Sequence, residues 1–153
     1  MRIMTGHIKG LRKLTGLFAA LALSACASLP NTEKTPPTDN FAKPAAAEVI
    51  AVGFDNISDK YIEPVRISRI GVEGLRGLGA IDAGLSLTEQ GGQMIMYGSG
   101  REIGRMQLPA ETDIRAWAAA VVALTEKARE NSSDIRAAPA EKIYEAIFDG
   151  ALS

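Results

Sequence analysis

The positions of the apolar residues predict two helices in the middle of the chain. The first runs from about Ala45 to the turn at Pro64, because apolar side chains recur along it at helical spacing: Val49, Ile50, Phe54, Ile57 and Tyr61. The second runs from about Ile67 to Leu78, and its inward face consists of Ile67, Ile70, Leu75 and Leu78. Glycines at positions 71, 74 and 77 lower its helical propensity by about 1 kcal/mol each. Their spacing indicates a side of the helix that a neighbouring element approaches closely.

The pattern changes to period two between Gly84 and Leu108, which predicts short strands. Leu85 and Leu87 alternate with polar residues in the first of them. Glycine-rich turns at residues 90–93 and 98–100 divide the segment into three strands. The segment therefore predicts a small antiparallel β-meander.

Two further helices are predicted after the strands, from about Glu111 to Glu130 and from about Pro139 onward. The inward face of the first consists of Ile114, Trp117, Val121 and Leu124, so Trp117 is interpreted as a core residue. The last helix turns Ile143, Ile147 and Phe148 inward, followed by Ala151 and Leu152. Residues 131–134 separate the two helices, with Ser133 or Asp134 as the expected cap. The predicted class is α+β, with about four helices and a three-stranded antiparallel meander over residues 45–153.

The amino-terminal segment, residues 1–25, has the layout of an export signal. Four basic residues and no acid precede or flank a short apolar run from Leu14 to Leu23, and small residues follow it. The run is too short to span a bilayer, which needs roughly 20 apolar residues. The segment is therefore expected to be removed on export.

The end of this signal resembles the lipobox of bacterial lipoproteins. Leu23, Ser24 and Ala25 supply an aliphatic and two small residues before Cys26, whose thiol would accept a diacylglycerol. Acyl chains on Cys26 would anchor the mature chain, because each buried methylene contributes about 0.8 kcal/mol. Ala27 follows, and by resemblance to enterobacterial lipoproteins this favours the outer membrane, with the protein facing the periplasm. Residues 26–44 contain four prolines and few apolar residues, and are predicted to be a flexible tether.

Removal of the signal limits the available chemistry. The whole chain has 17 basic and 18 acidic residues, and four basic residues leave with the signal, so the mature chain carries a formal charge of −5. This charge does not favour nucleic acid as a partner. The one histidine, His7, leaves as well, and the one cysteine, Cys26, becomes a thioether. Ser-His-Asp triads, Cys-His dyads, zinc sites built on His or Cys and an internal disulfide are thereby excluded.

Other motifs have simpler interpretations. The glycine-rich run from Gly98 to Gly104 lies between strands and has the wrong spacing for a nucleotide-binding loop. The acids Glu111 with Asp113, and Asp55 with Asp59, fit helix starts and exposed faces better than a catalytic pair. No serine and lysine share the local pattern of a Ser-Lys nucleophile. No catalytic residue, metal site or cofactor is therefore expected.

Three segments together resemble the amino-terminal region of carboxyl-terminal processing (tail-specific) serine peptidases. They are Tyr61-Ile62-Glu63-Pro64-Val65, Glu73-Gly74-Leu75-Arg76-Gly77-Leu78, and the stretch from Ala140 to the closing Gly150-Ala151-Leu152-Ser153. The resemblance covers roughly residues 45–153. In that family a PDZ domain and a Ser-Lys catalytic core follow this region, so the resemblance assigns no catalytic role to any residue of this chain.

The resemblance leaves two hypotheses for the function. In the first, the chain is the lipid-anchored, non-catalytic portion of such a peptidase, and residues similar to Leu-Asp-Pro would follow Ser153. In the second, the chain is a small stand-alone lipoprotein that acts as a binding or adaptor module in the cell envelope. The second hypothesis predicts an exposed apolar patch that a protein partner occupies.

Overall fold

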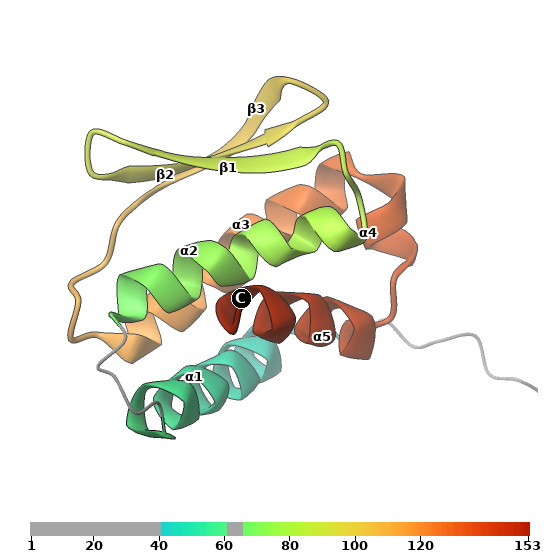
Figure 1. The fold of residues 1–153 in the computed structure, drawn as a ribbon. Coiled ribbons are helices and arrows are strands. Elements are labelled where there is room, and N and C mark those ends of the chain that lie inside the picture. The colour runs from blue at the N-terminus through green and yellow to red at the C-terminus, as the bar shows by residue number, and fades with distance from the viewer. Residues whose placement is uncertain (1–40, 61–65) are drawn as a thin grey trace, which may run out of the picture. The chain divides into compact units, whose positions relative to one another are not determined.

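The computed structural model describes residues 41–60 and 66–153, and these form an α+β fold (Figure 1). The elements in chain order are α1 (Lys43–Lys60), α2 (Ile67–Gly77), the 3-10 helix η1 (Leu78–Ala80), β1 (Leu85–Gln90), β2 (Gln93–Gly98), β3 (Arg101–Gln107), α3 (Ile114–Asn131), α4 (Ser133–Ala137) and α5 (Ala140–Ala151). The predicted class and the three-stranded antiparallel sheet are confirmed.

The helices and the sheet form layers. The sheet covers one side of α2 and α3, while α1 lies on the far side of the helices from the sheet (Figure 1). Helix α5 packs beside α2, and α1 packs against α3. The sheet and α1 therefore occupy opposite faces of the described part of the chain.

Helix α1 begins two residues earlier than predicted, at Lys43, so the predicted tether of residues 26–44 is wrong at its carboxyl end. Phe41 just before the helix is only 4% exposed. Its ring lies 5.6 Å from the ring of Tyr144, and the Arg129 guanidinium lies 5.3 Å above it. Pro44 falls in the first turn, where a missing N–H costs nothing. Burial of Phe41 thus draws residues 41–44 into the fold.

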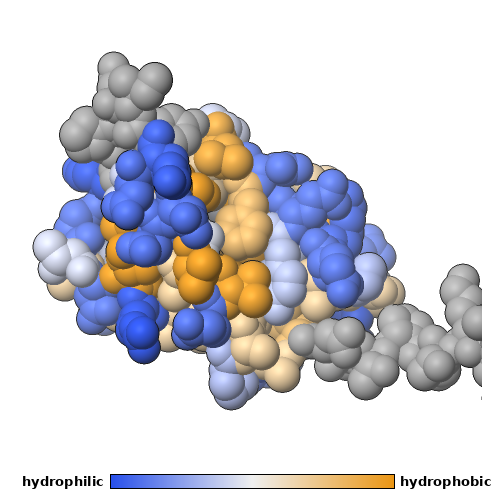
Figure 2. Space-filling model, turned by 90° about the horizontal axis from the view of Figure 1, so that it is seen from below, coloured by the Kyte–Doolittle hydropathy of each residue, from blue (hydrophilic) through white to orange (hydrophobic). Residues whose placement is uncertain are grey.

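One face of α1 is buried and the other is exposed. Ala46, Ile50 and Phe54 are buried, as their spacing predicted. Val49, which was expected to extend this apolar stripe, is instead 42% exposed. Figure 2 shows the molecule from the α1 side, where hydrophobic residues form a band between hydrophilic ones.

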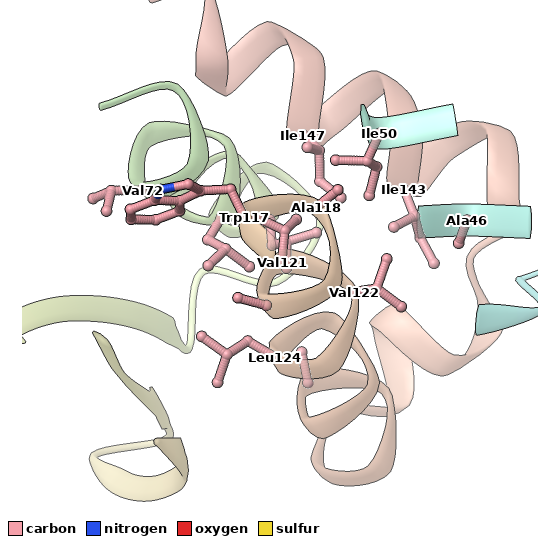
Figure 3. Close-up of a cluster of buried hydrophobic side chains, with 14 of the residues drawn as sticks. Ala46, Ile50, Val72, Trp117, Ala118, Val121, Val122, Leu124, Ile143 and Ile147 are labelled. Carbon is pink, nitrogen blue, oxygen red and sulfur yellow. The ribbon is translucent and has the colours of Figure 1, made fainter. Parts of the chain in front are cut away.

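The core is centred on α3. Trp117 is fully buried, as predicted, and Val121, Val122 and Leu124 continue the buried surface along the helix (Figure 3). Side chains from α1, α2 and α5 surround α3 in this cluster, and those labelled in Figure 3 are Ala46, Ile50, Val72, Ile143 and Ile147. Burial of these aliphatic groups is the main favourable term for the fold.

The register of the sheet follows from its two turns and from a β-bulge in β3, opposite Met96 and Tyr97 of β2. Gly91 and Gly92 connect β1 to β2 with φ values of 60° and 75°, and Ser99 and Gly100 connect β2 to β3 with 51° and 78°. Positive φ at both central residues is the type I′ geometry that suits a two-residue hairpin. Leu87 pairs with Met96, which pairs with Gly104 on the third strand. The buried side chains of Leu87 and Met96 therefore lie on one face, toward the helices.

Candidate functional site

The residues of the predicted lipid attachment site lie outside the part of the chain that the structure describes. These are Leu23, Ser24, Ala25 and Cys26. The segment Tyr61-Ile62-Glu63-Pro64-Val65, one of the three that carry the family resemblance, lies outside it as well. The lipid anchor and the role of this segment stay predictions.

Several serine hydroxyls and lysines in the described part bind other groups, and no hydrogen bond joins a serine to a lysine there. The hydroxyls bind carboxylates or a main-chain oxygen: Ser68 binds Glu111 at 3.0 Å, Ser132 binds Asp82 at 2.6 Å and Ser153 binds the Gly150 carbonyl at 2.7 Å. Lysines pair with acids: Lys127 with Glu130 at 2.7 Å and Lys142 with Glu145 at 2.8 Å. Within residues 41–60 and 66–153, no group of three acids, histidines or cysteines is placed to hold a metal ion.

The four acids that were considered as possible catalytic pairs either hold parts of the fold together or lie exposed. The Asp113 carboxylate accepts a hydrogen bond from the Ala116 amide at 2.9 Å and caps α3. Glu111 accepts hydrogen bonds from the amide and hydroxyl of Ser68. Asp55 and Asp59 are exposed on α1. Neither pair shares a depression in the described part of the chain, but Asp55 and Asp113, one acid from each pair, line the same depression between α1 and the start of α3.

The closest helix contact that the glycines identify lies between α2 and α5, and we call it the α2–α5 seam. It contains Gly74 and Gly77 of α2 and Gly150 of α5. A methyl group at Gly74 would lie 3.1 Å from the Ile147 carbonyl oxygen, and one at Gly77 would overlap the Ala146 carbonyl. A methyl group at Gly150 would lie 2.8 Å from the Gly77 Cα. The seam therefore has no room for a methyl group at Gly77 or Gly150, and at Gly74 the neighbouring carbonyl would have to shift by a few tenths of an ångström.

The third glycine of α2 faces a different neighbour. A methyl group at Gly71 would lie 2.6 Å from Cε3 of Trp117 on α3. Residues three apart on a helix are offset by about 60° around its axis, so a series of three spans about 120°. The predicted close approach is confirmed, but it involves α5 at Gly74 and Gly77 and the Trp117 ring at Gly71.

A carboxylate joins the loop before β1 to the turn before α4. Asp82 accepts hydrogen bonds from the Ser132 hydroxyl at 2.6 Å and the Gly84 amide at 2.7 Å. The Ser132 oxygen in turn accepts from the Ile135 amide at 3.2 Å. Ser132 therefore caps the short helix α4, and the prediction of Ser133 or Asp134 as the cap is wrong. A cap one residue earlier is favoured because only Ser132 is placed to bind Asp82 as well.

The bonds to Asp82 predict a pH dependence of stability. The Ser132 hydroxyl and the Gly84 amide stabilise the ionised carboxylate and lower the pKa of Asp82 below its usual value of 3.8. A pKa lowered in the folded state adds stability above the usual pKa, and this stability is lost as the pH falls through the folded-state pKa. We expect Asp82→Asn to lower the free energy of unfolding at pH 7, and the difference from the wild type to shrink at about pH 3.

Urea denaturation at the two pH values measures this difference. Asp55→Asn is the matched control, because the Asp55 carboxylate makes no hydrogen bond or ion pair within the described residues. An Asp82→Asn effect that is the same at both pH values would mean that the charged carboxylate does not bind these donors in solution.

The exposed apolar side chains cluster around α1 and α5. Val49 and Val52 of α1 are 42% and 52% exposed, and Leu152 at the end of α5 is 48% exposed. Between them, the half-buried Phe148 ring packs against the main chain at Gly53. We call Val49, Val52, Phe148 and Leu152 the α1/α5 band, which lies on the face shown in Figure 2.

A surface depression borders this band on the α3 side of α1. It has a volume of about 420 Å³ and is lined on α1 by Glu48, Ala51, Val52 and Asp55, and on the α3 side by residues 112–115. Val52 thus belongs to both surfaces. The depression is open, and its carboxylates come from both sides: Glu48 and Asp55 of α1, and Asp113 before α3.

No helix in the described ranges is both long and apolar enough to cross a membrane. Comparison of the chain with protein-family models, with curated proteins and with solved structures finds no match in any of the three.

Proposed function

We propose that this chain is the lipid-anchored, periplasmic and non-catalytic amino-terminal portion of a carboxyl-terminal processing serine peptidase. In this proposal Cys26 holds the chain to a membrane, with the outer membrane favoured. Residues 41–153 support the PDZ and peptidase domains that follow this region in that family. The chain itself cleaves nothing.

The α2–α5 seam is the observation that carries the proposal. Two of the segments that resemble the peptidase family, residues 73–78 and 140–153, are separated by more than sixty positions in the chain. Their glycines nevertheless meet at the seam, where Gly77 and Gly150 leave no space for a methyl group. The two segments that carry the resemblance therefore form one helix pair in the fold, and this contact supports the proposal.

The side-chain chemistry is consistent with a non-catalytic role. A Ser-Lys dyad needs the lysine amine within hydrogen-bond reach of the serine hydroxyl, at about 2.6–3.2 Å. In the described part, Lys127 and Lys142 pair with acids, and the hydroxyls of Ser68 and Ser132 bind acids. These contacts support a role in which the described part provides support and attachment.

The proposal predicts the covalent state of the chain in a bacterial envelope. We expect the amino-terminal peptide to begin at Cys26 and to carry acyl chains, and the protein to sediment with the membranes. Cys26→Ser removes the thiol and is expected to abolish acylation and membrane association. Mass spectrometry of the purified chain and membrane fractionation measure the two effects. Ser28→Ala, two residues away, is the control and should leave both unchanged.

Two results would contradict the proposal. An unacylated chain that begins at Met1 would remove the anchor and the periplasmic location. Hydrolysis of peptides with apolar carboxyl ends by the purified chain would remove the non-catalytic role. The codons after Ser153 add an independent check, because the proposal expects a phrase similar to Leu-Asp-Pro there.

A second candidate function is a stand-alone lipoprotein that acts as a binding or adaptor module. The α1/α5 band favours it, because three large apolar side chains exposed together are typical of a protein-binding surface. A stop codon directly after Ser153 would favour this candidate over the first.

A further inference from the structure

The α1/α5 band is bordered by acids on both sides. On α1, the exposed residues Glu48, Asp55 and Asp59 lie on the side of Val52 that faces away from α5. On α5, three exposed acids recur every fourth residue from the first turn to the last: Glu141, Glu145 and Asp149. Figure 2 shows the hydrophobic band with hydrophilic residues on each side. The surface is therefore apolar along its centre and negative along its borders.

Few cations offset these acids. Within residues 41–60 and 66–153, the acids on α1 form no ion pair. On α5, Lys142 binds Glu145 at 2.8 Å, which leaves Glu141 and Asp149 without an ion pair of their own in the described part. Lys60, in the last turn of α1, is the other cation on these two faces, and Lys43 lies at the far end of α1, near Glu126. Across the depression beside α1, Arg115 faces Glu48 and Asp55. Six carboxylates thus face two lysines and one arginine along the band.

We propose that the α1/α5 band binds an amphipathic helical segment of a partner protein, with aliphatic side chains along its centre and lysines or arginines along its borders. The apolar side chains of such a segment remove Val49, Val52 and Leu152 from water. Its basic borders meet the carboxylates of α1 and α5, and opposite charges across an interface favour encounter and orientation. The charge pattern selects this occupant.

The same pattern disfavours two other occupants. A second copy of this chain would bring its own acidic borders against those of the first, because a symmetric dimer places the same patch on both sides. The surface of an anionic membrane would likewise face carboxylates, whereas membrane-surface helices carry lysine and arginine on their polar faces. Dimer formation and binding to anionic vesicles are both measured as alternative outcomes of the test.

The test uses the full chain, with the processing that it undergoes in a bacterial host, and a fluorescent probe peptide. The probe has about 18 residues, with leucines at helical spacing and lysines beside them. One control peptide replaces every lysine by glutamate, and another replaces every leucine by serine. Fluorescence anisotropy gives the dissociation constant, with the same detergent in every sample and the signal from detergent alone subtracted.

The protein variants separate the apolar and the charged contributions. We expect the double substitution Val49→Ser with Val52→Ser to weaken binding of the leucine-lysine probe about tenfold or more. We expect Asp55→Asn with Asp59→Asn to weaken it and to reduce its dependence on salt. All four side chains are exposed, so folding should survive, and thermal unfolding checks this. Thr88→Ser, on the exposed outer side of the sheet, is the matched control and should bind as the wild type does.

Several results would overturn the proposal. Equal binding of the glutamate peptide, or an affinity unchanged by the valine substitutions, would show that the band and its borders do not select this ligand. Vesicle binding or dimer formation that the valine substitutions abolish, without binding of the probe peptide, would assign the band to a lipid surface or to a second copy. None of these readouts depends on the lipid anchor or on peptidase activity, so the proposal and the proposed function can fail separately.

Discussion

Substitution of Gly77 by alanine is expected to lower the free energy of unfolding by about 3 kcal/mol. Alanine normally stabilises a helix relative to glycine by about 1 kcal/mol, so the sign itself is diagnostic. The loss arises because the new methyl group would overlap the Ala146 carbonyl, which belongs to the main chain of α5 and cannot rotate away. Gly150→Ala meets the main chain of α2 at Glu73 and Gly77 and should cost a similar amount.

Gly79→Ala provides the matched control for the seam. Gly79 lies in the 3-10 helix directly after α2, and a methyl group there would have its nearest neighbour 4.0 Å away, at the Leu85 carbonyl oxygen. We expect this variant to be neutral or more stable by up to about 1 kcal/mol. Chemical denaturation followed by circular dichroism measures the free energy of unfolding of the three variants, Gly77→Ala, Gly150→Ala and Gly79→Ala. If Gly77→Ala matched Gly79→Ala, helices α2 and α5 would not be in close contact in solution.

Truncation of Trp117 is the second change with a large expected effect. The Trp117 side chain is fully buried in the core around α3, beside the main chain of Gly71 (Figure 3). Trp117→Ala should cost about 3–5 kcal/mol, since it removes a large buried ring and leaves a cavity. Small domains have total stabilities of about 5–15 kcal/mol, so this variant is expected to be close to unfolding at 37 °C.

Trp117→Phe separates loss of the ring from loss of its polar group. The indole Nε1 of Trp117 is buried and has no hydrogen-bond partner among the described residues. Phenylalanine keeps most of the apolar volume and removes this unpaired donor, whose burial is unfavourable. We expect Trp117→Phe to cost less than half as much as Trp117→Ala. Equal losses in urea denaturation would indicate that Nε1 does find a partner in solution.

Local sequence alone was sufficient to predict the three strands and the two turns of the sheet. Two-residue turns, Gly91-Gly92 and Ser99-Gly100, separate strands with period-two patterns, and glycine occupies three of the four positions with positive φ. These signals depend only on residues within a few positions of one another. The burial of Trp117 and the existence of four longer helices followed from helical spacing in the same way.

Contacts between distant residues decided what local patterns missed. Phe41 is buried because Tyr144 and Arg129, about one hundred positions away, cover its ring, so the start of α1 was placed too late. The cap of α4 is Ser132 because its hydroxyl reaches Asp82, fifty positions earlier. Val49 belongs to the apolar pattern of α1 but lies outside the surface that α3 and α5 cover.

The sequence by itself therefore determined the α+β class, the hairpins and the core face of α3, since each depends on periodicity or on residue type. It also carries the whole case for lipid on Cys26, which lies outside the described residues. Only the tertiary structure decided which glycines meet across the α2–α5 seam and which apolar residues remain exposed in the α1/α5 band. Burial and close approach are properties of pairs of elements, and no single element's pattern specifies its neighbour.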